Sequence, residues 1–564
     1  MQELQRKHAN STLSPNSYYN NAKKYICRVM GSALLVGIST SPLDAMEFGT
    51  MGNLSASMGG AGVALKSPFA LYYNPALIAS DSKMRIGYSI GLGMEQSNLD
   101  KLTNLNFTQM ISSLTSLGSQ LGGGSKGITR AMPATNGKAA SNFTGALQEA
   151  LKNSGAQGND LESLWKDYEQ KHQGSADHSQ LVGNLKDAVN NSSLSQEQKD
   201  MFDDLAGSVD WGNFDISSGK ITSLTIKSGS NGALDAAMKD LDTLFEVLKN
   251  NNMNAISQSG LVFQLSNKTL QDKFGSIAVG VFNTAQAGVS LVGDSSRMRL
   301  IFGEGNEFYE LTVNGGGYTL KQSSKDDYDK YSILKSVQDG NAHKVVSSVF
   351  NLTELPVGYA YRFNFGNSEL SLGATGKFMI GTSLYHEQYL GTNLQFNSDF
   401  ASNTQYSSSF GIDLGTYYGY NFSDTSQFGI GVVVKNINTP TFRFNTAPTI
   451  TIKPQYRAGV AYNGKRFSLA FDADILPNEV LSYSQYGLYS QMIGGGFKLD
   501  YKYIDIRGGV AYDLLRDTGA IITAGMNLFG FIDISAEVGT KWVDYFGTTA
   551  PKYANIRVGG SFSW

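Results

Sequence analysis

The sequence predicts an all-β transmembrane barrel of about 14 antiparallel strands, with a small N-terminal hatch and a helical insertion after the first strand. Three observations lead to this prediction. Apolar and polar residues alternate in short segments from residue 261 to the end of the chain, as in strands with lipid on one face and a polar lumen on the other. The connections between these segments are alternately short and long. Charged residues of both signs fall on the face opposite the aromatic residues.

The composition fits a barrel and excludes other classes of protein. The chain has 564 residues with 63 Gly, 29 Tyr and 30 Phe, and 16% of its residues are charged, against about 25% in a typical soluble domain. The net charge of −3 offers no basic face, so we expect no direct nucleic-acid partner. Apolar runs stay below the roughly 18 residues that a membrane-spanning helix needs.

Residues 1–45 are interpreted as a leader that contains a secretory signal peptide. A basic region at residues 23–28 precedes an apolar stretch of 12 residues, Val29–Thr40, which is too short to span a bilayer. We expect cleavage after Ala45, which starts the mature chain at residue 46. The single cysteine, Cys27, would leave with the signal, so the mature chain would carry no disulfide and no thiol chemistry.

Residues 46–83 precede the first strand, and the family resemblance given below implies that they form a hatch. The Gly59–Gly62 segment lacks the Lys-Ser/Thr of a nucleotide-binding loop, so it is interpreted as the backbone of a tight turn. The motif Asn74-Pro75-Ala76 is a turn or helix-start signal.

The first barrel strand, residues 84–96, is followed by a long segment of different character. Residues 97–258 are polar and rich in Asn, Ser and Gly, and Ser195 with Gln198 marks a capping box at a helix start. We therefore expect a helical, polar extracellular insertion over 97–258. One apolar stripe at helical spacing could be a binding face, although the core of the insertion is its more ordinary role. The stripe consists of Leu234, Met238, Leu241, Phe245 and Leu248.

The remainder of the barrel, residues 259–564, returns to a period of two residues. Asn463-Gly464 is a strong signal for a tight hairpin, and every second connection is short. With the N-terminus in the periplasm, the long connections would all lie outside the cell, a sorting that a soluble sandwich does not need. Strands are expected near residues 84–94, 261–268, 274–292, 352–365, 369–383, 406–420, 427–436, 453–462, 466–475, 490–500, 503–514, 519–528, 531–541 and 555–564. The long connections are 97–258, 293–351, 384–405, 437–452, 476–489 and 542–554.

The two faces of these strands have different chemistry. Apolar and aromatic side chains are expected to face lipid, and charges of both signs are expected to face the lumen, where water or opposite charges solvate them. The outward set includes Tyr359, Tyr361, Phe363, Tyr456, Val460, Tyr462, Phe467, Leu469, Phe471, Ile532, Ile534 and Val538. The inward set is Arg362, Lys377, Asp413, Arg457, Asp472, Asp474, Asp505, Arg507, Asp533, Glu537 and Arg557.

The last ten residues alternate strictly and end in an aromatic residue, which is unusual for a soluble protein. The alternative is the edge strand of a soluble sandwich. The segment is similar to the C-terminal assembly signal of bacterial outer-membrane barrels, which implies recognition by the barrel assembly machinery. The residues of this signal are Arg557, Gly559, Phe562 and Trp564.

No pattern in the sequence supports an enzyme, a metal site or a cofactor. Ser89 lies in a match to the nucleophile-elbow motif, but the match falls within an alternating strand instead of a strand-to-helix turn. Asp472 and Asp474 share a strand face, where an acid/base pair is conceivable. We expect them to pair with Arg457 of the neighbouring strand instead. The five histidines show no metal-ligand spacing.

Several segments together resemble one family. They are Met58–Ala64, Tyr73–Ala76, Leu372–Lys377, Val434–Asn436, Pro454–Tyr462 and Ile506–Val510, together with the insertion after strand one. The chain resembles the outer-membrane conjugal transfer protein TraF family, within the FadL-like barrels, over nearly all of 46–564. The resemblance implies a hatch inside the barrel and a location in the outer membrane of a Gram-negative bacterium, in contact with its lipid. It also implies a role in plasmid conjugation, with other transfer-apparatus proteins as expected partners.

Two functions follow from this interpretation. The first is a structural or assembly role at the cell surface, with the insertion presented outward. The second is a passive FadL-like channel for small hydrophobic solutes. A channel of that kind should line its path with apolar groups, whereas the inward charges predict a polar, self-paired lumen that favours the first function.

Overall fold

The structure is a computed structural model. It describes residues 43–44, 46–80, 84–104, 140, 142–173, 177–217, 219–227, 232–249, 251–266, 271, 273–304, 307–314, 317–389, 404–483, 487–501, 503–545 and 548–563. The predicted leader up to residue 42, residue 45 and Trp564 lie outside the described residues.

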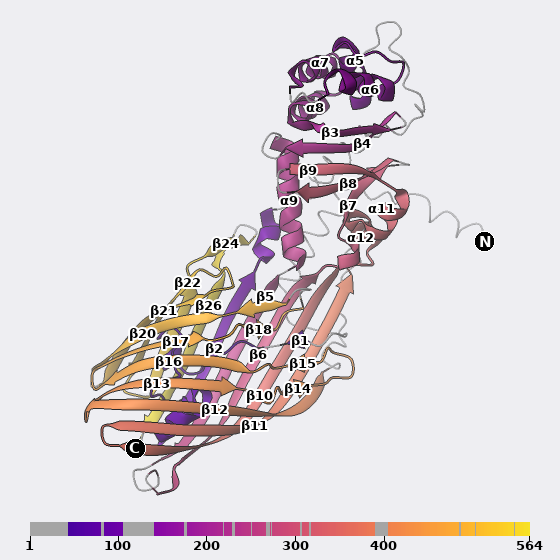
Figure 1. The fold of residues 1–564 in the computed structure, drawn as a ribbon. Coiled ribbons are helices and arrows are strands. Elements are labelled where there is room, and N and C mark those ends of the chain that lie inside the picture. Colours follow the sequence, from indigo (N-terminus) through magenta and orange to yellow (C-terminus); the bar gives the residue numbers. More distant parts are fainter. Residues whose placement is uncertain are drawn as a thin grey trace, which may run out of the picture.

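Within the described residues, fourteen antiparallel strands form a closed barrel, which confirms the predicted fold class (Figure 1). Each barrel strand pairs with the next barrel strand along the chain, and the last barrel strand pairs with the first to close the barrel. The strands are β2 (Arg85–Ser97), β5 (Asn252–Leu265), β6 (Ser276–Val292), β10 (Lys344–Phe365), β11 (Ser368–Tyr389), β12 (Gln405–Ser423), β13 (Ser426–Lys435), β16 (Gln455–Gly464), β17 (Phe467–Asp474), β20 (Met492–Tyr501), β21 (Ile504–Asp513), β22 (Ala520–Leu528), β23 (Ile532–Gly539) and β26 (Tyr553–Ser563). Among the helices that the structure describes, none has the length and apolar character needed to cross a membrane.

Alternation along the strands separates an apolar outer face from a buried inner face. In β10, Leu355, Val357 and Tyr359 are 38%, 59% and 48% exposed, whereas Ala360 between the outward positions is buried. The short connections at one end, called here the turn end, fall where the sequence analysis expects them. The opposite end is called the domain end. On β10 the burial pattern agrees with the predicted alternation of outward and inward residues.

The barrel wall is uneven in height. β10 and β11 each have 22 residues, whereas β17 has 8. The apolar outer face of β10 covers Leu355–Phe365, which matches the roughly 9–11 residues of a membrane-spanning strand. Beyond it the outer face becomes polar, and Asn283 of β6 donates to Asn351 (2.7 Å) and Thr353 (2.9 Å). Residues 283–292, 344–354 and 379–389, called the raised wall, therefore extend past the apolar band.

Two expected strand starts are wrong for this reason. The sequence analysis begins the strands at 261 and 352, but β5 begins at Asn252 and β10 at Lys344. Where these strands leave the apolar band, their outer face no longer carries lipid-facing side chains, so the alternation of apolar and polar residues ends before the hydrogen-bonded ladder does. The predicted end of the insertion, residue 258, accordingly falls inside β5.

The long connections after β2 and β6 fold together into one outer domain, residues 142–249 and 293–343 (Figure 1). Its sheet has the order β3-β4-β9-β8-β7, so the insertion over 97–258 contains the predicted helices and also two strands, β3 and β4, that the sequence analysis does not expect. The strands are β3 (Val209–Ser217), β4 (Lys220–Lys227), β7 (Leu300–Glu304), β8 (Glu307–Asn314) and β9 (Gly317–Ser323). The helices are α5 (Phe143–Asn153), α6 (Leu161–Lys171), α7 (Ser179–Asn190), α8 (Gln196–Ser208), α9 (Gly232–Lys249), α11 (Lys325–Tyr331) and α12 (Ile333–Asp339).

The helical part of the outer domain contains the predicted capping box and the predicted apolar stripe. Ser195 and Gln198 form the predicted capping box at the start of α8. In α9, Leu248 is 3% exposed and Phe245 packs against the domain core, as the core interpretation of the stripe expects for these two residues. The side chains of the other three stripe residues lie outside the description.

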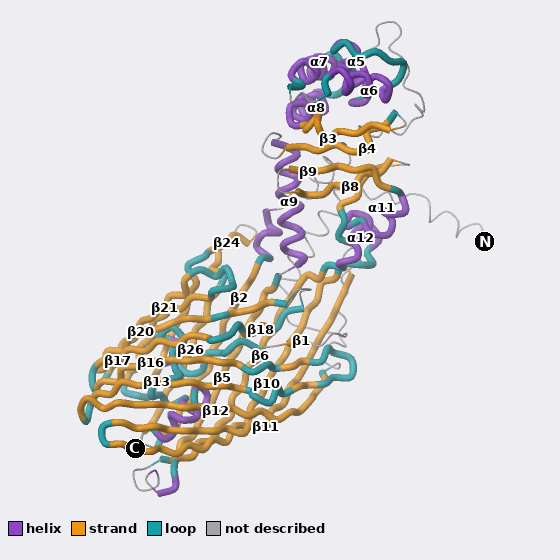
Figure 2. The backbone as a smooth tube through the Cα atoms, viewed as in Figure 1, coloured by secondary structure: helices purple, strands orange, loops and turns teal. Residues whose placement is uncertain are grey.

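The hatch and a small cap complete the barrel. The hatch helices α2 (Asn53–Ala56), α3 (Ala70–Tyr73) and η1 (Pro75–Ala79) lie inside the strands (Figure 2). At the domain end, β15 (Ile450–Thr451) and β14 (Thr441–Phe442) form a sheet with β1 (Leu43–Asp44), which belongs to the predicted leader and would be absent from a chain cleaved after Ala45. Phe442, Ile450 and Leu481 pack in one cluster with Phe350 and Leu352, so this cap covers the inner face of the raised wall.

Candidate functional site: the occupied lumen and the pocket above it

The Asn74-Pro75-Ala76 motif fixes the hatch to the barrel wall. Asn74 is fully buried. Its Nδ2 donates to the carbonyl oxygens of Val63 and of Thr416 on β12, at 2.9 Å each, and its Oδ1 accepts from the Ala76 N–H at 3.0 Å. Pro75 has no N–H to lose at the first position of η1. The motif therefore caps its own helix and binds the wall at once.

Inward glycines let the hatch approach the wall this closely. A Cβ at Gly415 would overlap the Asn74 side-chain oxygen, and one at Gly431 would overlap the Val63 carbonyl. A Cβ at Gly373 would overlap the backbone of the Pro75–Ala76 step. The neighbouring strands therefore have no side chains where the motif contacts them. Glycine is needed at these positions because the hatch backbone lies too close to the wall for a Cβ.

Asp472 binds the hatch instead of a lumen cation. Its Oδ2 accepts from the N–H groups of Gly62 (2.8 Å) and Val63 (2.9 Å). The register places Asp474 opposite Arg457, and Arg457 Nε donates to Asp474 Oδ1 at 2.7 Å. The expected pairing with Arg457 is therefore correct for Asp474 and wrong for Asp472, because adjacent inward positions of β17 face different neighbours.

The other predicted lumen charges point inward and meet opposite charges. Lys377, which is 2% exposed, contacts Glu354 (2.9 Å) and Asp413 (3.0 Å). Such pairs stabilise a buried charge only when the geometry and the additional hydrogen bonds are good, and Asn436 Oδ1 also accepts from Lys377 at 2.6 Å. The remaining pairs are Arg362 with Glu369 (3.4 Å), Arg507 with Asp505 (2.5 Å) and Asp533 (2.8 Å), and Arg557 with Glu537 (3.9 Å).

Hatch aromatic rings cover two of the lumen cations. Lys435 Nζ lies 3.6 Å from the ring centroid of Tyr72 and 4.7 Å from that of Phe48. The Arg457 guanidinium carbon lies 4.0 Å from the Phe48 centroid. Cations over aromatic faces are attracted by the ring quadrupole, more strongly where water is excluded. Lys435 and Glu354 were missed in the sequence, although both occupy inward positions of their strands.

The start of the hatch is tied to the domain end by Arg516, in the connection after β21. Its guanidinium contacts Glu47 (2.7 Å), Asp513 (2.6 Å) and Glu95 of β2. Arg516 is 7% exposed. The hatch is thus held at both ends, by this cluster and by the motif around Asn74.

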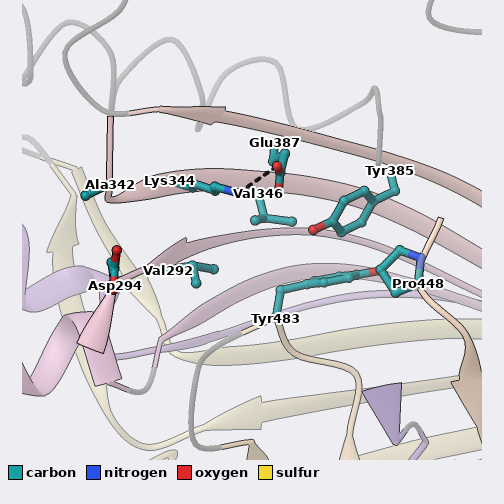
Figure 3. A pocket seen from close by; sticks show the side chains of 10 residues that line it. Val292, Asp294, Ala342, Lys344, Val346, Tyr385, Glu387, Pro448 and Tyr483 are labelled. Carbon is teal, nitrogen blue, oxygen red and sulfur yellow. Dashed lines mark hydrogen bonds and ion pairs between the residues drawn. The ribbon is translucent and has the colours of Figure 1, made fainter. Parts of the chain in front are cut away.

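A pocket of about 320 Å³ lies on the inner face of the raised wall (Figure 3). Tyr385 and Tyr483 form one side, with ring centroids 4.9 Å apart. Lys344 and Glu387 form an ion pair of 2.7 Å at another side. The other lining residues are Val292, Gly293, Asp294, Ala342, Val346 and Pro448. The pocket combines apolar and charged walls, so it could accept a small amphiphilic molecule.

The outer domain contains a buried histidine beside this pocket. The Asp294 N–H donates to His343 Nδ1 (3.1 Å), and Nε2 lies 2.6 Å from Ser336 Oγ. An accepting Nδ1 requires the neutral ring with its proton on Nε2. Burial lowers the pKa of His343, which favours the same form.

The structure gives Ser89, which lies in the match to the nucleophile-elbow motif, a structural role. Ser89 lies within β2, away from any strand-to-helix turn, and its Oγ donates to Asn53 Oδ1 at 2.9 Å. Among the described residues, no group of three or more His, Cys, Asp or Glu is arranged to hold a metal ion.

The C-terminal signal residues take separate positions. The Arg557 side chain is buried in the lumen, Gly559 pairs with Ser89 of β2, and Phe562 is 52% exposed on the outer face. Phe562 stacks against Phe531 at 6.4 Å between centroids.

Solved structures that match the chain include two toluene transporters and a FadL homologue. The chain is 12% identical to the toluene transporter TbuX of Ralstonia pickettii, with a TM-score of 0.35 over 91% of this chain and 98% of that one. It is 11% identical to the toluene transporter TodX of P. putida, with a TM-score of 0.36 over 92% and 99%. It is 9% identical to a Pseudomonas aeruginosa FadL homologue, with a TM-score of 0.32 over 91% and 97%.

A family comparison supplies the assignment. A search of curated protein sequences finds no match. The family described as "F plasmid transfer operon, TraF, protein" matches residues 183–474, which is more than half of the chain and includes parts of the outer domain and of the barrel. The resemblance seen in the sequence is confirmed: this protein belongs to the TraF family of the F plasmid transfer operon.

Proposed function

We propose that the protein is an outer-membrane anchor that holds a folded domain at the cell surface for a plasmid transfer apparatus. The proposal rests on one observation above others, the hydrophobic core that the outer domain shares with the barrel. Val289 and Leu291 of β6 and Val345 of β10 belong to the same cluster as the buried residues of the outer domain. A domain joined in this way is positioned by the barrel, as a scaffold requires.

Hydrogen bonds reinforce this junction. Asn251, between α9 and β5, is fully buried. Its Nδ2 donates to the carbonyl oxygens of Val247 and Leu291, and its Oδ1 accepts from the Leu291 N–H, each at 2.6 Å. A buried amide that satisfies three backbone groups at one point fixes α9 relative to β6.

The occupied lumen also supports a structural role. The hatch is held by Asn74, by Asp472 and by the Arg516 cluster, and the lumen charges are paired with one another. Release of the hatch would leave buried charges and N–H groups without partners, which is costly. An apolar solute would in addition have to pass desolvated charges.

The experiment that tests this proposal removes the outer domain and keeps the barrel. Residues 99–250 and 294–342 are each replaced by a short Gly-Ser turn, and Val289, Leu291 and Val345 are changed to Thr because they would become exposed. The strands on either side pair without the domain, so a heat-modifiable barrel should still appear in the outer-membrane fraction. Plasmid transfer should fall to the level of a strain without the protein.

A matched control removes only the far helices of the outer domain, residues 142–208, and leaves in place the sheet and the part of the shared core next to the barrel, which includes Leu248, Leu291 and Val345. This variant tells whether the helical part or the sheet carries the contact with other transfer proteins. Normal transfer by the barrel that lacks the whole domain would refute the anchor proposal.

A second candidate function is a passive channel for small hydrophobic solutes, and the pocket beside Tyr385 and Tyr483 favours it. Liposome swelling separates the two functions. We expect the intact protein to give background rates with small sugars and fatty acids. Brisk flux that Tyr385→Ala and Tyr483→Ala reduce, together with normal transfer without the outer domain, would establish the channel.

A further inference from the structure

We propose that the hatch has a second function, as a latch that fastens the seam where the barrel closes. The seam is the pairing of the first strand, β2, with the last, β26. It joins Arg85–Glu95 to Tyr553–Ser563, the two barrel strands that lie farthest apart in the sequence. Pairing of these two strands therefore has the largest loop-closure entropy cost of any pairing in the barrel. A contact that favours this pairing would offset part of that cost.

One hatch side chain contacts both strands of the seam. Asn53, at the start of α2, donates from Nδ2 to the backbone oxygen of Arg557 on β26 at 3.1 Å. Its Oδ1 accepts from Ser89 Oγ on β2 at 2.9 Å. The same Nδ2 donates to the backbone oxygen of Asp533 on β23, the strand that precedes β26 in the barrel, at 2.9 Å. The Asn53 side chain therefore bonds to three consecutive strands.

Gly559 of β26 leaves room for this contact because it has no side chain. Gly559 pairs with Ser89 on one side and with Asp533 on the other. A Cβ at Gly559 would lie 2.7 Å from Asn53 Oδ1 and would also overlap the Tyr88 carbonyl. The Asn53 amide occupies the space between the two flanking side chains. Asn53 and Ser89 are 3% and 1% exposed, so water cannot replace the partners.

The segment that follows Asn53 extends the contact along the strands before the seam. Arg507 of β21 donates to Ser57 Oγ at 3.3 Å, and the Gly59 N–H donates to Thr523 Oγ1 of β22 at 3.1 Å. Hatch residues 53–59 thus touch strands β21, β22, β23, β26 and β2. The Asn53 amide can satisfy its donors and its acceptor together only when β2 lies beside β26. Hatch docking and seam closure therefore favour each other by the same free energy.

The opposite side of the hatch offers a matched control. Asn74 has the same side chain, is also buried, and also donates to a strand backbone, that of Thr416 on β12. β12 is far from the seam in the barrel order. Loss of Asn74 should loosen the hatch without a direct effect on closure, whereas loss of Asn53 should affect closure itself.

The test measures seam closure directly in the full chain. Cys27→Ser removes the single cysteine, and cysteines are introduced at Leu92 and Ile556, an outward pair that faces across the seam. The chain is folded into lipid vesicles under mild oxidant, and the rate of disulfide formation reports closure. Asn53→Ala should slow this rate several-fold, and Asn74→Ala should slow it much less, because a hatch that is loosened at β12 still bonds to the seam through Asn53.

Equal rates for Asn53→Ala and the parent would overturn the proposal, and so would an equal loss in Asn53→Ala and Asn74→Ala, which would indicate a general effect of hatch loosening. If Asn53→Ala does not fold, Ser89→Ala provides the second variant, since it removes only the hydroxyl that Asn53 accepts from. Ser89→Ala should slow closure in the parent and have no further effect when Asn53 is replaced by Leu in a folded barrel, because leucine has no oxygen to accept from Ser89 Oγ. Independent, additive losses would reject the latch.

Discussion

Phe471 and Asp472 are neighbours on β17 that meet opposite surroundings. Phe471 is 48% exposed on the outer face, whereas Asp472 is 3% exposed and binds the hatch. Phe471→Lys should lower the free energy of unfolding by about 2–4 kcal/mol, because it places a charge near the middle of the lipid-facing band. Asp472→Asn should cost less, since an amide oxygen can still accept from both hatch N–H groups. Urea unfolding in lipid vesicles measures both, and the reverse ranking would contradict the strand register.

Asp472→Ala tests whether the carboxylate anchors the hatch. This change leaves the N–H groups of Gly62 and Val63 buried without their acceptor, at a cost of roughly 1–3 kcal/mol for each unsatisfied group. The hatch should become accessible to protease while the barrel strands stay protected. Limited proteolysis from the turn end provides the measurement, and unchanged protection relative to Asp472→Asn would show that the anchor is dispensable.

His343 predicts a pH dependence of the outer domain. Its pKa is lowered in the folded protein, so the folded state binds a proton less readily than the unfolded chain, whose histidine titrates near about 6.5. Stability should therefore be constant above that pH and fall as the pH drops below it. His343→Gln should flatten the profile. Thermal unfolding followed by the fluorescence of Trp165 and Trp211, both in the domain core, checks the sign. A rise in stability on acidification would refute it.

At the scale of elements, the strands could be predicted because lipid imposes a period of two on each of them. The hatch contacts could not, because they join residues far apart in sequence. Asn53 bonds to backbone groups 480 and 504 positions away, and no local pattern marks it. The Asn74 motif was found only because its turn chemistry is local. Lys435 and Glu354 follow the inward alternation, yet nothing local shows which partner each meets.

The split domain was missed for a related reason. Its sheet pairs β4 with β9, so residues 223–227 lie beside 317–321 although two barrel strands separate them in sequence. Helical spacing in 97–258 was visible, whereas strand pairing across two connections leaves no periodic signal. The raised wall was missed because its outer face meets water and the outer domain instead of lipid.

The closing strand leads to a prediction about assembly. Removal of Phe562–Trp564 shortens β26 and takes away Phe562, which pairs with Ile86 of β2 and stacks on Phe531. The edge of β2 would then keep unpaired backbone groups at membrane depth, which is unfavourable. Heat-modifiable barrel should disappear from the outer-membrane fraction.

Phe562→Ala keeps the strand length and serves as the control for this truncation. It should reduce the yield of folded barrel less than the truncation does, because the backbone ladder remains. A normal heat-modifiable barrel in the truncated protein would contradict the assignment of the C-terminal signal.

At the scale of the whole molecule, the shared core makes the outer domain and the barrel one mechanical unit. The domain connects to the barrel through the chain itself at β2, β5, β6 and β10, through Asn251 and through the cluster that contains Leu291. A flexible tether would let the domain reorient, whereas this junction transmits the orientation of the barrel. The scaffold function depends on this property.

Leu291→Ala tests the junction. Leu291 is 7% exposed, and truncation of a buried leucine costs roughly 2–5 kcal/mol, because the neighbours close the cavity only in part. Because Leu291 lies on barrel strand β6, at the junction of the two parts, hydrogen exchange should rise together in α9 and in residues 344–354 of β10. Leu185 is a fully buried leucine of the same cluster, but it lies on α7, which packs against α5 and α8, so Leu185→Ala should raise exchange only among the far helices. If Leu291→Ala raises exchange in the domain alone and leaves the raised wall unchanged, the two parts are independent. Transfer should decline in Leu291→Ala even though the barrel and the far helices remain folded, since the orientation of the domain is then no longer set by the membrane.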